Sequence, residues 1–205
     1  MKTVTGFIAL LFFSMFIFSS CVESSNQETT QELSEYDQFW QMLAHHCGNA
    51  YGGEITSKPE GAELFDGREY LVVHFRECDD EEEMRLPFHA QNLDDTWDRS
   101  RTWVLYHHGE ILELRHDHRN PDGTEEESTW YGAFSGDVVS ANQTEFIRER
   151  SPESDAPESG WRIEIEPDER YTYGTIRDGE WSWRLDFDLT ESVNTPPAPW
   201  GFEEE

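Results

Sequence analysis

The chain has 205 residues, of which 44 are acidic and 15 are basic, so that its formal net charge is −29. A surface with this charge repels nucleic-acid phosphates and anionic lipid head groups, and DNA- and RNA-binding classes are therefore excluded. Lysine is nearly absent, with Lys2 and Lys58 the only two. This scarcity fits either a salt-tolerant source or a genome that favours arginine.

Residues 1–20 have the organisation of an export signal. Lys2 precedes an apolar run that extends from Gly6 to Phe18, and two serines then lead directly into Cys21. A positive start, an apolar core of about 7–15 residues and small residues at the cleavage point are typical of secretory signals. A membrane-spanning helix needs about 20 apolar residues, which is more than this run provides.

The sequence Ser19-Ser20-Cys21 at the end of the run resembles the lipobox of bacterial lipoproteins, with Phe18 where the family usually has Leu. The resemblance implies that signal peptidase II cleaves before Cys21 and that Cys21 is lipidated. It also implies an exported protein whose partner is the membrane of the cell envelope. In a Gram-negative source this would be the outer membrane, because Val22 rather than Asp follows the cysteine. An ordinary secretory signal with an unmodified Cys21 is the alternative.

The remaining chain divides into two parts. Residues 21–35 are poor in aliphatic side chains and are predicted to be a disordered tether. Residues 36–205 are predicted to form a single domain, which begins with a short helix over 36–46 and ends in a Pro-rich tail held on the surface by Trp200 and Phe202. In an exported chain, the pair Cys47 and Cys78 indicates one disulfide, with two buried thiols as the alternative.

From residue 50 onward, apolar and polar residues alternate, as they do in half-buried strands. The segment EWSWRLDFDL (180–189) shows this most clearly, and Asp178-Gly179 before it is a hairpin signal. Short connections favour an all-β, antiparallel up-and-down meander that closes into a barrel. About ten strands are expected, over residues 50–56, 69–78, 83–90, 101–108, 111–118, 126–134, 143–150, 160–166, 170–177 and 180–189.

In architecture, an acidic meander with an N-terminal helix and a disulfide resembles calycin or lipocalin-like barrels, although AYGGEI stands where a lipocalin has its Gly-x-Trp signature. The chain is also similar to uncharacterised bacterial secreted proteins. That similarity rests on three stretches, SRTWVL (100–105), HDHR (116–119) and Asp122-Gly123. It implies no particular activity.

A pair of histidines is the main candidate for a site. In ILELRHDHR, Leu112 and Leu114 mark the inner face, so His116 and His118 are expected to point inward as well. A hairpin at Gly109 would place Leu105 near Leu114 and Trp103 near His116. Three roles remain open for the two imidazoles: ligands of a metal or haem iron, the polar floor of a ligand cavity, or structural hydrogen bonding.

Aromatic and basic side chains complete the candidate site. The tryptophans expected on inner faces are Trp103, Trp161, Trp181 and Trp183. Arginines concentrate between residues 76 and 119, where they could bind a carboxylate or phosphate or could form ion pairs with nearby Asp side chains such as Asp98 and Asp117. The candidate ligand-binding residues are Arg101, Trp103, His107, His116 and His118.

Three functions remain open. The leading hypothesis is a non-catalytic, lipid-anchored envelope protein that binds a small, partly apolar ligand in its barrel. The second is a structural or interaction lipoprotein with a filled barrel. The third is a hydrolase or isomerase that uses His116, Asp117 and His118, or a metal-dependent enzyme. Motifs for a serine nucleophile elbow, a zinc protease, a P-loop or a dinucleotide fold are absent from the sequence.

Overall fold

The computed structural model describes Lys2 and residues 33–63, 65, 70–78, 80–136 and 140–202. Cys21, the predicted signal and most of the predicted tether lie outside the described residues. Leu33–Glu205 form one compact unit, which contains the helix and all the strands given below. Among the described residues, no helix has the length and apolar character needed to span a membrane.

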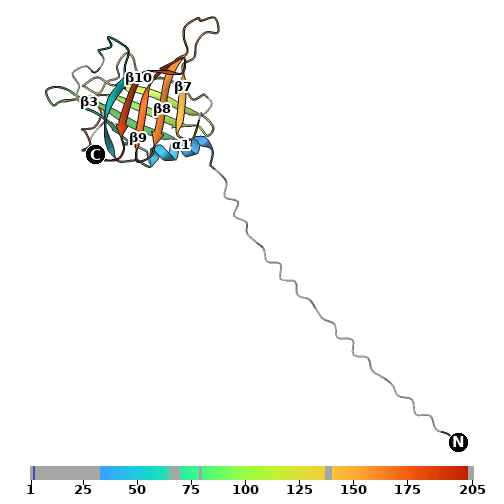
Figure 1. Cartoon of the computed structure of the whole chain (residues 1–205). Coiled ribbons are helices and arrows are strands. Elements are labelled where there is room, and N and C mark those ends of the chain that lie inside the picture. Colours follow the sequence, from blue (N-terminus) through green and yellow to red (C-terminus); the bar gives the residue numbers. More distant parts are fainter. Residues whose placement is uncertain are drawn as a thin grey trace. The chain divides into compact units, whose positions relative to one another are not determined.

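The predicted N-terminal helix is α1 (Glu35–Ala44). Ser34 caps its start, because the Ser34 hydroxyl oxygen accepts a hydrogen bond from the Asp37 backbone N–H at 3.1 Å. Phe39, Trp40 and Leu43 form its buried face, as their spacing predicted. The helix lies across one end of the strands, at the bottom of Figure 1.

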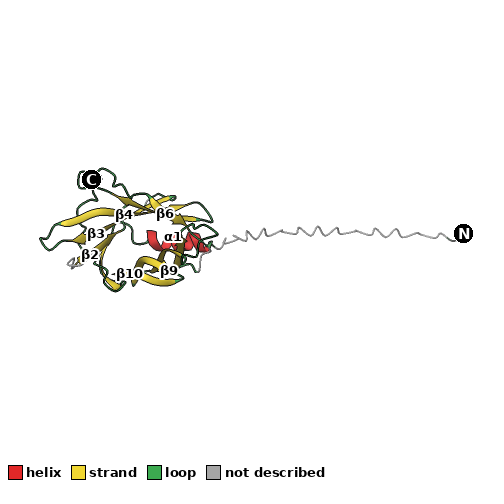
Figure 2. Cartoon of the chain, turned by 90° about the horizontal axis from the view of Figure 1, so that it is seen from above, coloured by secondary structure: helices red, strands yellow, loops and turns green. Residues whose placement is uncertain are grey.

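The strands form one antiparallel sheet in which each strand pairs with the next one in sequence, except that β6 and β7 stand at the two ends, and the predicted meander is thereby confirmed (Figures 1 and 2). The order β6-β5-β4-β3-β2-β1-β10-β9-β8-β7 brings the first strand against the last. The strands are β1 (Ala50–Ser57), β2 (Tyr70–His74), β3 (Glu83–Gln91), β4 (Trp97–His107), β5 (Leu112–His118), β6 (Tyr131–Phe134), β7 (Gln143–Ile147), β8 (Ser159–Glu166), β9 (Arg170–Arg177) and β10 (Glu180–Asp188).

The sheet is not closed between its two end strands, β6 and β7. In the described part of the chain, β6 and β7 are not joined by a ladder of hydrogen bonds. They are linked by an isolated bridge between Ser135 and Phe146 and by a hydrogen bond from the Gly136 N–H to the Glu145 carbonyl at 3.1 Å. β6 is also shorter than the predicted strand over 126–134. Trp130 has a φ of 57°, which is incompatible with an extended strand, so that pairing begins only at Tyr131.

The β4–β5 hairpin has the predicted register. Trp103 lies opposite His116 and Leu105 lies opposite Leu114. Gly109 in the connecting turn has a φ of +80°, a conformation that glycine adopts without steric cost. This register determines which side chains of β4 and β5 lie next to each other on the inner face of the sheet.

The C-terminal tail lies on the outer face of the sheet as predicted. The Trp200 N–H donates to the Arg99 carbonyl at 3.1 Å, and the Arg99 guanidinium donates to the Ala198 carbonyl at 2.8 Å. The ring of Phe202 lies 5.3 Å from the Arg85 guanidinium and 5.7 Å from that of Arg119. The tail therefore lies against the cationic side chains of Arg85 on β3 and of Arg119, which directly follows β5.

The arginines on the outer face form ion pairs with acidic side chains of the chain. This is one of the two roles predicted for them, and the other was binding of a carboxylate or phosphate. The fully buried Asp117 side chain lies 2.7 Å from Arg119 and 3.9 Å from Arg85. Arg115 pairs with Glu113 on the same strand. These arginines are engaged by carboxylates of the chain itself, so the outer face does not offer them to an anionic ligand.

Candidate ligand cavity

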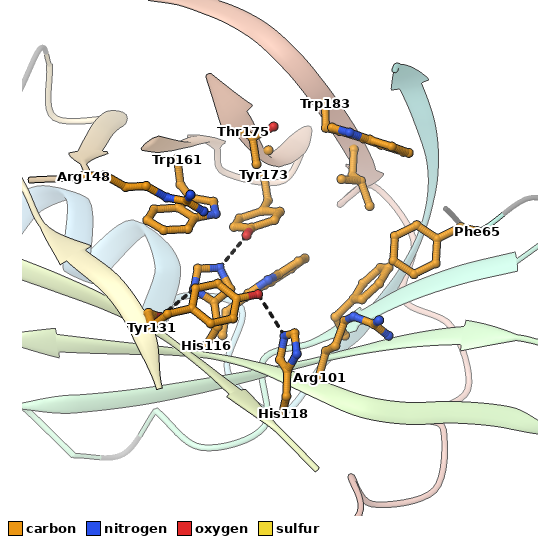
Figure 3. Close-up of a pocket in the computed structure, with 14 residues that line it drawn as sticks. Phe65, Arg101, His116, His118, Tyr131, Arg148, Trp161, Tyr173, Thr175 and Trp183 are labelled. Carbon is orange, nitrogen blue, oxygen red and sulfur yellow. Dashed lines mark hydrogen bonds between the residues drawn. The ribbon is translucent and has the colours of Figure 1, made fainter. Parts of the chain in front are cut away.

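A cavity of about 260 Å³ lies at the inner face of the curved sheet, at the end away from His107 and α1. Aromatic rings form most of its wall, and Figure 3 shows them converging from several strands. The lining residues are Phe65, Phe88, Arg101, Trp103, His116, His118, Tyr131, Arg148, Trp161, Tyr173, Gly174, Thr175, Trp183 and Leu185.

Four of the five predicted ligand-binding residues meet in this cavity. Arg101 and Trp103 come from β4, and His116 and His118 come from the paired β5. Alternation along both strands turns all four side chains inward, as the sequence predicted.

His107 does not join them, although it lies on the same strand. At about 3.3 Å per residue, the four positions that separate His107 from Trp103 place it roughly 13 Å further along β4. There its Nε2 is 3.3 Å from the Asp37 carboxylate, and its ring centroid is 5.3 Å from that of Trp40. The contacts of His107 thus belong to the packing of α1 against the sheet.

His116 forms the polar floor of the cavity. Its Nδ1–H donates to the Tyr131 carbonyl at 3.0 Å, and this bond leaves Nε2 as an acceptor for the Tyr173 hydroxyl at 2.6 Å (Figure 3). Burial raises the pKa of Tyr173 well above its usual value, so the hydroxyl keeps the proton that it donates. Burial lowers the pKa of His116 to about 3, and the ring is neutral at physiological pH.

A second hydrogen-bonded pair lies beside the first. The Tyr131 hydroxyl is 3.2 Å from Nε2 of His118, whose Nδ1 faces the Glu126 carboxylate at 3.7 Å. A proton on Nδ1 is favoured by that carboxylate, and Nε2 then accepts from Tyr131. Burial, followed by the nearby Arg101 guanidinium, lowers the pKa of His118.

Both imidazoles therefore have partners from the chain itself. Among the described residues, no group of three or more His, Cys, Asp or Glu side chains is arranged to hold a metal ion. The two nitrogens of His116 are occupied by Tyr131 and Tyr173, and neither is offered to a substrate in this arrangement. The geometry matches the second of the three predicted roles, a polar floor, and its hydrogen bonds also make the histidines structural.

Stacked rings build the apolar part of the wall. The Trp103 indole lies between the ring of Tyr173, at a centroid distance of 3.9 Å, and that of Phe88, at 5.2 Å, and it is stacked on both. Next to this stack, the Tyr131 ring stacks on His116 at 4.6 Å, and the ring of Trp161 is 4.8 Å from the same imidazole. Such contacts fix ring orientations and keep the apolar surface preformed.

One expected tryptophan is not in the wall. Trp161 and Trp183 line the cavity as predicted, but Trp181 lies near the outer-face residue Arg162, whose guanidinium is 5.0 Å from its ring. The pairing of β10 with β9 shifts by one residue between Trp181 and Trp183, and a bulge of this kind turns the earlier side chain to the other face.

Gly174 accommodates the bulge. A Cβ atom added at Gly174 would lie 2.0 Å from the Trp183 carbonyl oxygen, so only glycine fits opposite the displaced backbone. A glycine inside an otherwise β-forming run, RYTYGTIR, is a recognised sign of a bulge or of close backbone approach. That signal could have corrected the placement of Trp181.

Sequence reasoning missed four polar residues of the wall, one of which is Thr175 on β9. Tyr131 follows the residue with positive φ at the start of β6, Tyr173 lies on β9, and Arg148 comes directly after β7. Alternation in RYTYGTIR does place Tyr171 and Tyr173 on one face with the core. Alternation from Thr144 and Phe146 likewise points Arg148 inward, because the strand predicted over 143–150 contains it, although the observed β7 ends one residue earlier, at Ile147.

Comparisons with known proteins add no assignment. No family model matches the chain, and a search of curated proteins finds no significant relative.

Proposed function

We propose that this chain is a non-catalytic binding protein that holds a small, partly apolar ligand in the cavity lined by β3, β4, β5, β6, β8, β9 and β10. The observation that carries the proposal is a preformed aromatic cavity with a hydrogen-bonded polar floor. Ligand sites are typically apolar clefts of about 300–1,000 Å³ with a few fixed polar groups. The volume of about 260 Å³ lies just below this range and suits a small molecule of one or two aromatic ring systems.

Two observations favour binding over the alternatives. A structural protein with a filled barrel would be expected to pack its interior rings closely, because protein interiors normally contain few voids. This chain instead has a cavity lined by rings. An enzyme that used His116 would need one free nitrogen, and both are occupied. The proposal includes closure of the meander into a calycin-like barrel, supported by the bridge and the hydrogen bond between the end strands.

The neutral fluorescent probe N-phenyl-1-naphthylamine tests the proposed function. We expect saturable binding to residues 33–205, with a rise in probe emission, because the two aromatic ring systems of the probe, naphthyl and phenyl, can lie against the apolar wall. Thr175→Trp, which adds bulk at the wall, should weaken binding at least tenfold. Ser192→Trp adds the same side chain at an exposed position outside the cavity and should have no effect. Absence of saturable binding, or equal affinity in all three proteins, would overturn the proposal.

Export and lipid anchoring form the second part of the proposal, supported by the small residues and cysteine that follow the apolar run at 6–18. Acyl chains contribute about 0.8 kcal/mol per buried CH₂, and more than one chain gives stable anchoring. Cys21→Ala should therefore move the protein from the membrane fraction to the soluble fraction. Ser20→Ala keeps a small residue before the cysteine and serves as the control. A Cys21→Ala protein that still fractionates fully with membranes would contradict lipidation.

A further inference from the structure

The wall of the cavity has a charge opposite to that of the chain. Of the 205 residues, 44 are acidic, yet none of the fourteen lining residues is Asp or Glu. The lining residues that carry a fixed charge are Arg101 and Arg148. The formal net charge of the protein is −29, so most of its surface repels an anion. A wall with two arginines and no acidic side chain repels an anionic group less than that surface does.

Arg148 is the arginine that remains available. Its guanidinium lies over the indole of Trp161, 4.3 Å from the ring centroid, and no described carboxylate forms an ion pair with it. The other lining arginine, Arg101, already donates to Asp98 at 3.1 Å. A guanidinium that lies over an indole can still donate through the N–H groups that point away from the ring, and its forked N–H groups match the two oxygens of a carboxylate.

Arg162 is a second arginine whose guanidinium lies over an indole ring, and it lies on the outer face of the sheet. The ring is that of Trp181, at 5.0 Å, and the Arg162 guanidinium also donates to the Glu145 carboxylate at 2.6 Å. Within the described part of the chain, a carboxylate therefore pairs with the arginine over Trp181, and none pairs with the arginine over Trp161. Figure 3 shows Arg148 beside Trp161, on the opposite side of the cavity from Phe65 and Trp183.

We infer that the ligand is an apolar, ring-containing monocarboxylate, with its carboxylate on Arg148 and its rings against Trp161, Trp103 and Tyr173. This inference rests on the proposed function and specifies the ligand class of the same cavity. One unpaired guanidinium neutralises one charge, which favours a monoanion over a phosphate dianion. The apolar remainder of the wall suits the ring body of such an acid.

Two probes of nearly equal shape test the charge preference. 2-Naphthoate and 2-naphthamide differ by a carboxylate in place of a carboxamide, and calorimetric titration of residues 33–205 at low ionic strength gives both affinities. We expect 2-naphthoate to bind at least tenfold more tightly. In Arg148→Gln the preference should fall below threefold. Arg162→Gln removes the same charge from the matched pair on the outer face and should leave the preference above tenfold.

The outcomes separate this inference from the proposed function. Saturable binding of N-phenyl-1-naphthylamine together with equal or undetectable binding of the two naphthyl probes would overturn the inference and leave the cavity function standing. The inference would also be overturned by an Arg148→Gln protein that keeps its full preference. Failure of all three probes to bind would overturn the proposed function and the inference with it. Thermal unfolding of both variants shows whether the fold is intact, and an intact fold is expected for Arg148→Gln because the Arg148 side chain is exposed at a strand end.

Discussion

Trp103→Ala is expected to lower the free energy of unfolding by about 3–5 kcal/mol, the range for removing a large aromatic side chain from a core. Trp103 is 3% exposed, and its ring contacts four other aromatic rings. These are the rings of Phe88, Tyr171, Tyr173 and Phe187. Removal of the indole would join the cavity to the space that it now fills, and the neighbouring rings would lose their stacking partner.

Urea-induced unfolding of residues 33–205, followed by far-ultraviolet circular dichroism, measures this effect. Trp183→Ala is the matched control, because Trp183 also lines the cavity but is only half-buried. Trp183→Ala should lower the free energy of unfolding by less than half as much as Trp103→Ala. A loss below about 1 kcal/mol for Trp103→Ala would show that the ring is not the centre of the packing described here.

Loss of the disulfide is expected to have the next largest effect. Cys47 and Cys78 lie 31 positions apart in the chain, with their sulfur atoms at bonding distance, 2.03 Å. Closing a loop of this length stabilises the fold by about 3–4 kcal/mol on the chain-entropy model. The bond joins the end of α1 to the segment after β2, where the Gly48 N–H also donates to the Phe75 carbonyl at 2.7 Å.

The double variant Cys47→Ala with Cys78→Ala should therefore unfold at lower urea concentration than the oxidised protein. Dithiothreitol should destabilise the unmodified protein to a similar degree and leave the double variant unchanged. Thiol titration of the denatured, unreduced fragment gives an independent measurement. Two reactive thiols per chain would contradict the bond, and so would equal stability of the two proteins.

Local periodicity was sufficient to predict most of the fold. Alternation and turn residues gave all ten strands, although β2, β6 and β7 are each shorter than predicted, and the turn at Gly109 determined that Trp103 would face His116. These features depend on neighbours in sequence, which is why they can be read from it. The positions of Trp181 and of the start of β6 depend instead on one bulge and one left-handed residue, and each shifts the pattern locally.

The candidate site was only partly predictable, for a physical reason. Parity identified Arg101, Trp103, His116 and His118, because a strand's face follows from alternation. Alternation does not tell how far along the strand a side chain lies relative to the cavity. His107 therefore faces inward, but at the end of β4 near α1 and away from the cavity. Tyr173 reaches His116 from a strand 57 positions away, and contacts of that kind are set by sheet order rather than by local sequence.

The adjacency of the first and last strands has a consequence for folding. The Thr56 hydroxyl donates to the Asp186 carboxylate at 2.6 Å across 130 positions, within the ladder that joins β1 to β10. So high a contact order predicts slow folding, because the entropy of closing a long loop is lost before the ladder forms. During synthesis from the N-terminus, β1 would keep an unpaired edge until nearly the whole chain has emerged. The nascent chain is thus most vulnerable to edge-to-edge aggregation just before it is complete.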